Sequence, residues 1–161
     1  MSTEIDLKIT DSEWEIMRVV WAQKEVTSKE IIEVLQQKKD WKPATTKTFI
    51  GRLANKDMLD TRTEGRRYIY SPKVNEEKVV KSALHEQFNH ICNRDVGNTI
   101  AYLLSNATLS LKDIEKLEGV LEEKKKDAVE EVACNCIPGQ CECKSHHCSK
   151  DTCRERNLKK E

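Results

Sequence analysis

The residues best suited to chemistry in this sequence are its cysteines, six of which lie in the last 28 residues. Four of them form a Cys-x-Cys-x4-Cys-x-Cys pattern, made by Cys134, Cys136, Cys141 and Cys143. In extended backbone, side chains two residues apart point to the same side, so each Cys-x-Cys pair offers two sulfurs to one ion. Between the pairs, residues 137–140 read Ile-Pro-Gly-Gln, with Pro and Gly at the positions that a type II turn prefers. The pattern therefore predicts two sulfur pairs that face each other.

Four converging thiolates suit either of two metal ions. They fit the tetrahedral coordination of Zn(2+), and they also fit Cu(I), a soft ion that accepts low coordination numbers. Structural zinc sites usually use Cys-x-x-Cys, so the tighter spacing favours copper. Reversible thiol oxidation and tail disulfides are the alternatives, although a reducing compartment and an odd total of seven cysteines disfavour a disulfide framework. Further candidate ligands without a fixed spacing are Cys148, Cys153, His146 and His147.

The remaining cysteine and two further histidines have simpler expected roles. Cys92 follows Phe88 and Ile91 on a predicted apolar helix, so we expect it to be a small buried hydrophobic residue. His85 and His90 are expected to be ordinary surface or interface histidines. Neither prediction includes a role in metal binding.

The first half of the chain is basic, although the formal net charge of the chain is zero. Residues 42–73 contain eight basic side chains against three acidic ones, whereas residues 110–132 contain five lysines against eight acids. A local excess of positive charge on a neutral chain is typical of a surface that binds nucleic-acid phosphates. A merely solvated basic hairpin is the alternative interpretation.

Capping signals and apolar spacing predict three short helices followed by a hairpin. Residues 10–13 and 27–30 form two Thr-x-x-Glu capping boxes, and Pro43 fits the first turn of a third helix. Strand-like stretches at 58–63 and 66–71 enclose a Glu-Gly turn. We therefore predict a mainly α fold: a winged helix-turn-helix domain with a small β-hairpin wing, in which the third helix reads DNA.

The candidate DNA contacts lie on the third helix and the hairpin. The inward faces of the second and third helices are expected to be formed by Ile31, Val34 and Leu35, and by Thr46, Phe49, Ile50 and Leu53. The other face of the third helix is small, hydroxyl-bearing and cationic, without an acid. DNA contacts are predicted for Lys42, Ala44, Thr45, Lys47, Thr48 and Arg52, with Arg66 and Arg67 on phosphates.

Three further helical stretches follow the hairpin. They cover residues 76–91 and 95–104 and a segment capped by Ser110, which is expected to fray by about residue 132. Their apolar stripes are too short for a separate core, so we expect a homodimer that matches a palindromic operator. The predicted organisation is a winged-helix DNA-binding domain at 1–73, a helical dimerisation segment at 74–132 and a cysteine-rich metal-binding tail at 133–161.

Other functional classes receive less support from the sequence. No catalytic constellation stands out, so we expect a regulator rather than an enzyme. The first ten residues carry charges where a signal peptide needs an apolar run, and no stretch approaches the roughly 20 apolar residues of a membrane span. The expected location is the cytoplasm, without a membrane partner.

With these residues in view, the sequence resembles the penicillinase-repressor family, and within it the copper-responsive branch. The resemblance rests on SEWEIM at 12–17 with Trp21, on DWKPATTKT at 40–48, on EGRRYIYSP at 64–72 and on the four tail cysteines. The branch that answers β-lactams lacks such a tail. One departure is Lys42, which stands where a small hydroxyl residue is expected as the helix cap.

The resemblance implies a homodimeric repressor of copper-homeostasis genes, such as those for copper-export ATPases, at an inverted repeat of the TACA...TGTA type. It also implies that the zinc form binds the operator, and that Cu(I) displaces zinc at the same tail site and releases the DNA. A copper chaperone is a candidate partner. From the residues alone the sign of this response stays open. The alternatives are a metal-buffering or thiol-redox protein, and a repressor that senses zinc or cadmium.

Overall fold

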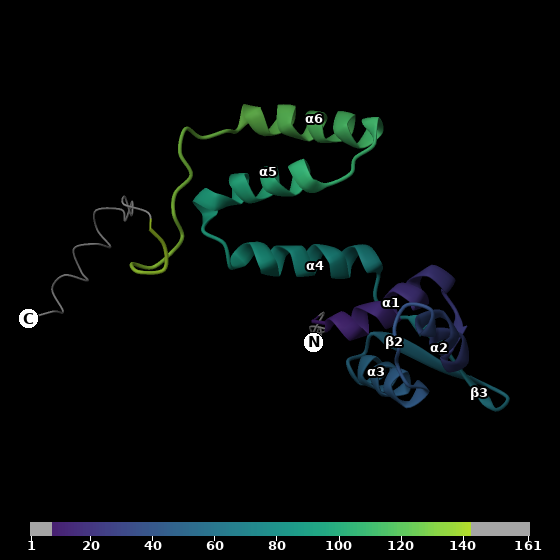
Figure 1. The fold of residues 1–161 in the computed structure, drawn as a ribbon. Coiled ribbons are helices and arrows are strands. Elements are labelled where there is room, and N and C mark those ends of the chain that lie inside the picture. Colours follow the sequence, from purple (N-terminus) through teal and green to yellow (C-terminus); the bar gives the residue numbers. More distant parts are fainter. Residues whose placement is uncertain (1–7, 143–161) are drawn as a thin grey trace, which may run out of the picture. The chain divides into compact units, whose positions relative to one another are not determined.

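The computed structural model describes residues 8–142, which form two compact units that divide near residue 86 (Figure 1). The chain is mainly helical with one small antiparallel sheet, which confirms the predicted fold class. In chain order the elements are α1 (Asp11–Gln23), β1 (Val26–Thr27), α2 (Ser28–Gln36), α3 (Pro43–Asn55), β2 (Leu59–Glu64), β3 (Arg67–Pro72), α4 (Glu76–Asn89), the 3₁₀ turn η1 (Asn93–Asp95), α5 (Val96–Asn106) and α6 (Leu111–Lys126).

Both predicted capping boxes are present and determine where the first two helices begin. At α1, the Thr10 hydroxyl accepts from the Glu13 amide at 3.3 Å, and the Glu13 carboxylate accepts from the Thr10 amide at 2.8 Å. At α2, Thr27 and Glu30 make the same pair of bonds at 3.3 and 2.7 Å. Each box satisfies backbone N–H groups that have no acceptor within the first turn of a helix.

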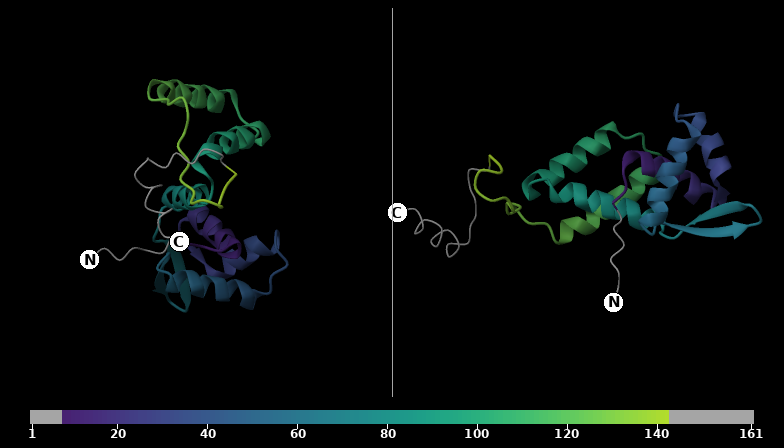
Figure 2. Two further views of the ribbon diagram at one scale, coloured as in Figure 1. Left: turned by 90° about the vertical axis from the view of Figure 1, so that its left-hand side faces the viewer. Right: turned by 90° about the horizontal axis from the view of Figure 1, so that it is seen from below.

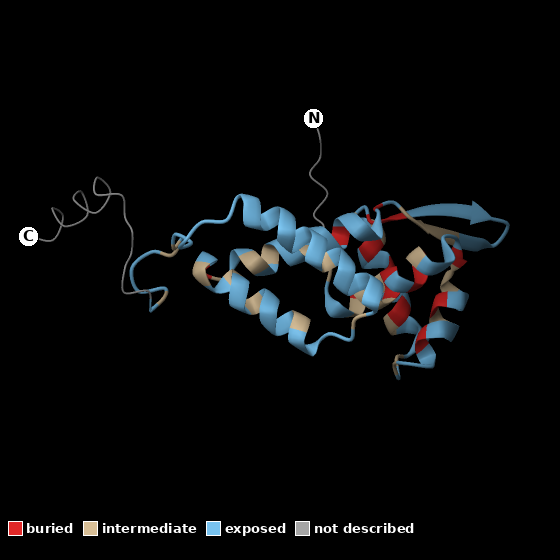
Figure 3. Ribbon diagram, turned by 90° about the horizontal axis from the view of Figure 1, so that it is seen from above, coloured by how far each residue is buried: buried red, intermediate tan, exposed pale blue. Residues whose placement is uncertain are grey.

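The buried side chains of the first unit lie among α1, α2, α3 and the sheet (Figure 3). Its most completely buried large residues are Ile16, Met17, Ile31, Ile50, Leu53 and Met58. Trp14 and Trp21 pack against this core with ring centroids 5.7 Å apart. One predicted core residue is misplaced: Val34 is 38% exposed, because only Ile31 and Leu35 of α2 face inward.

The sheet has the order β1-β3-β2, and its hairpin is the predicted wing (Figure 2). Pairing of Glu64 with Arg67 leaves Gly65 and Arg66 as the turn, one residue later than predicted. Gly65 has a φ of 61°, a conformation that fits the first central position of a type II′ hairpin turn. β1 was not predicted from the sequence; its Val26 and Thr27 pair with β3 and join the base of the wing to the start of α2.

Among the helices after the wing, α4 buries Val79, whereas α5 and α6 are exposed or half-buried along their whole length (Figure 3). No residue of α5 or α6, which are both fully described, is buried. Exposed apolar residues on these helices include Ile100, Leu103, Ile114, Val120 and Leu121. α4 ends two residues earlier than predicted, and α6 ends at Lys126. Within residues 8–142, no helix is long and apolar enough to cross a membrane.

Candidate functional sites

The predicted DNA-reading face of α3 lies on the surface. Within the predicted set, Ala44, Lys47, Thr48 and Arg52 are exposed and Thr45 is half-buried, while Thr46 on the opposite face is 1% exposed. Pro43 occupies the first turn, where its missing N–H removes no hydrogen bond. Lys42 is the N-cap residue, and its side chain makes no capping bond, so its ammonium group stays on the surface beside the start of α3.

The eight basic residues of segment 42–73 divide into two groups. Three of them pair with acids: Lys56 with Glu13, Arg62 with Glu25, and Lys73 with Asp57. The other five have no carboxylate within 4.0 Å among the described residues; they are Lys42, Lys47, Arg52, Arg66 and Arg67. All five are exposed, on α3 or on the wing. The excess positive charge of this segment is therefore concentrated on the predicted DNA contacts.

Two further contacts shape this face of α3. The Arg52 guanidinium lies 5.6 Å from the centroid of the Phe49 ring, which itself lies 5.1 Å from the Trp41 ring. This stacking restricts the arginine side chain before any partner binds. The Thr48 hydroxyl donates to the Ala44 carbonyl at 3.0 Å, so its oxygen is left as an acceptor.

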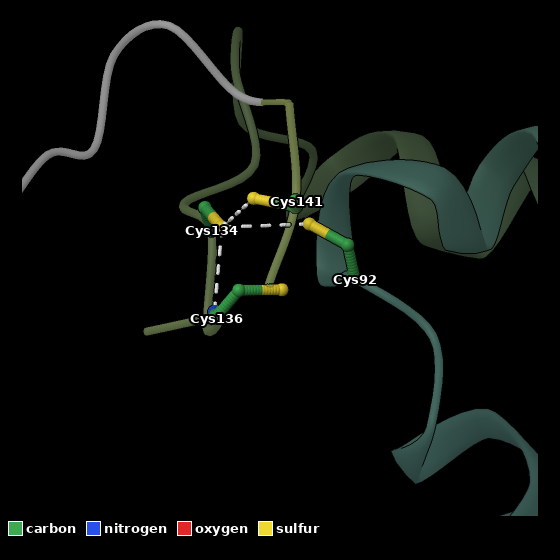
Figure 4. Close-up of side chains that lie close together, drawn as sticks. All are labelled: Cys92, Cys134, Cys136 and Cys141. Carbon is green, nitrogen blue, oxygen red and sulfur yellow. Dashed lines mark hydrogen bonds between the residues drawn. The ribbon is translucent and has the colours of Figure 1, made fainter. Parts of the chain in front are cut away.

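The second candidate site is a group of four thiols in the second unit (Figure 4). Cys134, Cys136 and Cys141 come from the tail, and the fourth thiol is Cys92, which lies between α4 and η1. The predicted turn brings the tail sulfurs together: Gln140 donates to the Ile137 carbonyl at 3.0 Å, and Gly139 has the φ of 93° that a type II turn requires.

The sulfur atoms lie at distances that suit a metal ion. Sγ of Cys134 is 3.5 Å from Sγ of Cys92 and 3.5 Å from Sγ of Cys141, and all four sulfurs lie within 4.8 Å of one another. Zinc–sulfur bonds of about 2.3 Å in a tetrahedron would place the sulfurs about 3.8 Å apart. Only small side-chain movements would therefore be needed for the four thiols to surround one ion.

The surroundings of Cys136 favour its protonated thiol. Burial and the neighbouring thiols of Cys92, Cys134 and Cys141 raise the pKa of Cys136 to about 12. A thiolate on Cys136 would be poorly solvated, and a second thiolate beside it would be repelled. A cation would reverse this preference, because metal binding releases thiol protons and compensates the negative charge. The donor set is all sulfur, which fits soft or borderline ions such as Cu(I) and Zn(2+).

The structure places most, but not all, of the cysteines singled out from the sequence. Cys134, Cys136 and Cys141 lie together, whereas Cys143, Cys148, Cys153, His146 and His147 lie outside the described residues. Cys92 is buried, as predicted, at 9% exposure, but its sulfur faces the tail thiols. Sequence spacing could not reveal this contact, because 42 residues separate Cys92 from Cys134.

The sequence matches the family described as "Penicillinase repressor" over residues 9–123. An uncharacterized 16.5 kDa protein from the ptsI 3′ region of Latilactobacillus sakei is 44% identical over 136 residues, covering 84% of this chain and 93% of that protein. The penicillinase repressor of Bacillus licheniformis is 31% identical over 118 residues, covering 73% and 92%. A structure of the CopR repressor is 38% identical, covers 42% of this chain and 99% of that chain, and has a TM-score of 0.37. The family match ends before the first tail cysteine.

Proposed function

The chain belongs to the penicillinase repressor family and is a transcriptional repressor rather than an enzyme. We propose that this repressor responds to copper. In this proposal a homodimer binds an inverted repeat of the TACA...TGTA type and represses copper-homeostasis genes, including those for copper-export ATPases. The zinc form binds the operator, and exchange of zinc for Cu(I) on the tail thiols releases it. The observation that carries the metal response is the thiol cluster of Cys92, Cys134, Cys136 and Cys141.

DNA binding through α3 and the wing is supported by the distribution of charge. The five basic side chains that have no carboxylate partner within residues 8–142 are available to phosphates, whereas Lys56, Arg62 and Lys73 are already paired with acids. We assign base-edge contacts to the exposed face of α3, made of Ala44, Thr45, Lys47, Thr48 and Arg52, and phosphate contacts to Lys42, Arg66 and Arg67.

Dimerisation through the helices after the wing is supported by their exposed apolar faces. Leu103 on α5 is 50% exposed, and Val120 and Leu121 on α6 are 52% and 53% exposed. Several exposed apolar side chains of this size on adjoining helices are what a partner surface would cover. A second copy is the natural partner, because two reader helices suit the two half-sites of an inverted repeat.

The metal response is supported by the chemistry of the thiols. The cluster provides an all-sulfur site near tetrahedral spacing, and Cys143 is a further tail ligand predicted from the sequence. When bound, the ion supplies the positive charge that holds several thiolates together. Cu(I) is favoured over Zn(2+) by soft sulfur donors, which gives the direction of exchange.

An operator-shift assay tests both parts of the proposal. The zinc-loaded protein should retard an inverted-repeat duplex and Cu(I) should release it, with zinc and cadmium titrated separately as alternative signals. The variant Cys134→Ser with Cys136→Ser should show the same operator affinity with zinc as with Cu(I). Equal retardation with zinc and Cu(I) would remove the copper response and leave DNA binding intact. Retardation abolished only by zinc or cadmium would make one of those ions the signal.

The salt dependence of the same complex tests the DNA contacts. Each phosphate contact contributes about 0.9 to the slope of log affinity against log salt concentration. Arg66→Ala should lower this slope by about 0.9 per wing, while Arg62→Ala, which removes an arginine already paired with Glu25, should change it less. Affinity that does not depend on salt would favour a metal-buffering or thiol-redox protein instead.

A further inference from the structure

Cys92 lies in a segment that contacts the tail through three successive residues. Its sulfur lies 3.5 Å from that of Cys134. The next residue, Asn93, donates its backbone N–H to the Asn135 side-chain carbonyl at 2.9 Å. Arg94 then approaches Glu131, with 3.8 Å between nitrogen and oxygen. The tail is therefore held against the α4–α5 junction, residues 92–94, by contacts that do not depend on sulfur alone.

Space for an ion lies beside the sulfur atoms. A cavity in this unit is lined by residues on both sides of the contact, among them Cys92, Asp95, Asn135, Cys136 and Cys141. Cys92 directly precedes the 3₁₀ turn that leads into α5, whereas Cys134, Cys136 and Cys141 lie outside any helix or strand. A metal ion bound to the Cys92 sulfur would therefore couple the occupancy of the site to α4 and α5.

We infer that Cys92 is the fourth sulfur of the zinc form and that it is released when Cu(I) replaces zinc. The inference rests on the proposed function and gives it a structural switch. Zinc sites made of thiolates are almost always four-coordinate, and the four thiols that converge within residues 8–142 include Cys92. Cu(I) is satisfied by two or three sulfurs, which the tail provides without residue 92.

The exchange changes which parts of the chain are connected. In the zinc form the ion joins the tail to the α4–α5 junction, so α5 and α6 lie within a closed loop between Cys92 and Cys134. In the Cu(I) form this connection opens: the Cys92 thiolate takes a proton from water, and neither metal changes its oxidation state. The opened loop carries the apolar faces assigned to the dimer contact, which links the metal to DNA affinity.

Cobalt(II) in place of zinc tests the ligand set directly. The full-length protein with Co(II) should show the absorption of a tetrahedral four-thiolate site. Cys92→Ser should lower the sulfur-to-cobalt charge-transfer intensity by about a quarter, as expected for four sulfurs reduced to three. Cys143→Ser is the matched variant in the tail: we assign Cys143 to the Cu(I) form and not to the four sulfurs of the zinc form, so this variant should leave the cobalt spectrum unchanged. The reverse result, a loss with Cys143→Ser and none with Cys92→Ser, would overturn the inference. Far-UV circular dichroism of each variant confirms that the helices are retained.

Alkylation of the wild-type protein tests the release without any substitution. Iodoacetamide followed by peptide mass spectrometry should find Cys92 protected in the zinc form and modified in the Cu(I) form, a gain of one reactive thiol per chain at this position. Asn135→Ala, which removes the bond to Asn93 and keeps every thiol, should increase modification of Cys92 in the zinc form. Equal protection of Cys92 with both ions would refute its release.

These measurements can fail separately from the proposed function. If Cu(I) releases the operator but Cys92 stays equally protected, the repressor responds to copper by another route. If Cys92 is protected by zinc and released by Cu(I) but the operator complex is unaffected, the ligand assignment stands and the copper response of the repressor is wrong.

Discussion

The two capping boxes of the first unit form a matched pair that tests how the reader domain is stabilised. Glu13 and Glu30 both follow a capping threonine by three residues. Glu13 is 1% exposed and also accepts a hydrogen bond from the Lys56 ammonium at 2.8 Å, which joins α1 to the residue after α3. Glu30 is exposed and accepts only from Thr27. Replacement by alanine therefore removes a cap at Glu30, and a cap together with an ion pair at Glu13.

The exposure of the two ion-pair partners sets the expected difference in unfolding free energy between Glu13→Ala and Glu30→Ala. Loss of a capping bond costs about 1 kcal/mol. Breaking a fully buried ion pair costs about 3–5 kcal/mol, but the Lys56 side chain is 32% exposed and recovers much of its hydration when Glu13 is removed. After this discount we expect Glu13→Ala to lower the free energy of unfolding by about 2–3 kcal/mol. Glu30→Ala should cost less than Glu13→Ala.

Acid should reduce this difference. Burial alone would raise the pKa of Glu13, but hydrogen bonds from Lys56 and from the Thr10 amide outweigh burial and lower it. The folded state therefore favours the carboxylate, and its contribution is complete above the unfolded pKa of about 4.3. The contribution is lost as pH falls through the lowered folded value. The stability gap between wild type and Glu13→Ala should be constant near neutrality and should narrow below about pH 4.

Urea unfolding followed by tryptophan fluorescence measures these free energies, since Trp14 and Trp21 pack against the core. A double-mutant cycle with Lys56→Ala isolates the ion pair from the cap. Equal losses for Glu13→Ala and Glu30→Ala, or a gap that does not change on acidification, would show that the ion pair contributes nothing.

Two further outcomes follow from the wing and from α6. Gly65→Ala should destabilise the first unit by about 1–2 kcal/mol, because an L-residue resists a φ of 61°. Gly51→Ala in α3 should stabilise it by about 0.5–1 kcal/mol. Apart from adjacent residues and the backbone of α3 itself, no described atom lies within 4 Å of either added Cβ, so thermal unfolding reports backbone preference alone. Leu121→Lys on α6 should shift the sedimentation of the protein towards monomer without loss of helical signal, and a retained dimer would place the interface elsewhere.

Local signals in the sequence predicted most of the first unit. The capping boxes at Thr10 and Thr27 and the proline at residue 43 marked helix starts correctly, because each signal acts within one turn. β1 was missed because a strand of two residues has no detectable periodicity and exists only through its pairing with Tyr70 and Ile69. Val34 was misplaced because a stripe on a short helix does not show which of its edges the neighbouring elements cover.

The candidate metal site was only partly predictable, for the same reason. The Pro-Gly turn and the Cys-x-Cys spacing are local, and the sulfurs of Cys134, Cys136 and Cys141 lie together, while Cys143 lies outside the described residues. The approach of Cys92 depends on how α5 and α6 return the chain to the end of α4, which no local pattern encodes. The sequence also did not show which basic residues of segment 42–73 form ion pairs, because Glu13 and Glu25, which pair with Lys56 and Arg62, lie outside that segment.

The long span of the sulfur contact has a consequence for synthesis of the protein. All residues of the first core have been translated once Val79 is made, whereas the partner of Cys92 is added only at Cys134. Because chains emerge from the ribosome N-terminus first, we expect the reader domain to fold before the thiol site can close. A chain that terminates ahead of residue 134 would then keep the parts assigned to DNA and dimer contacts and lack the sensor. In the proposed switch, such truncated chains lack the zinc connection that favours operator binding, so the target genes would stay expressed whatever the metal supply.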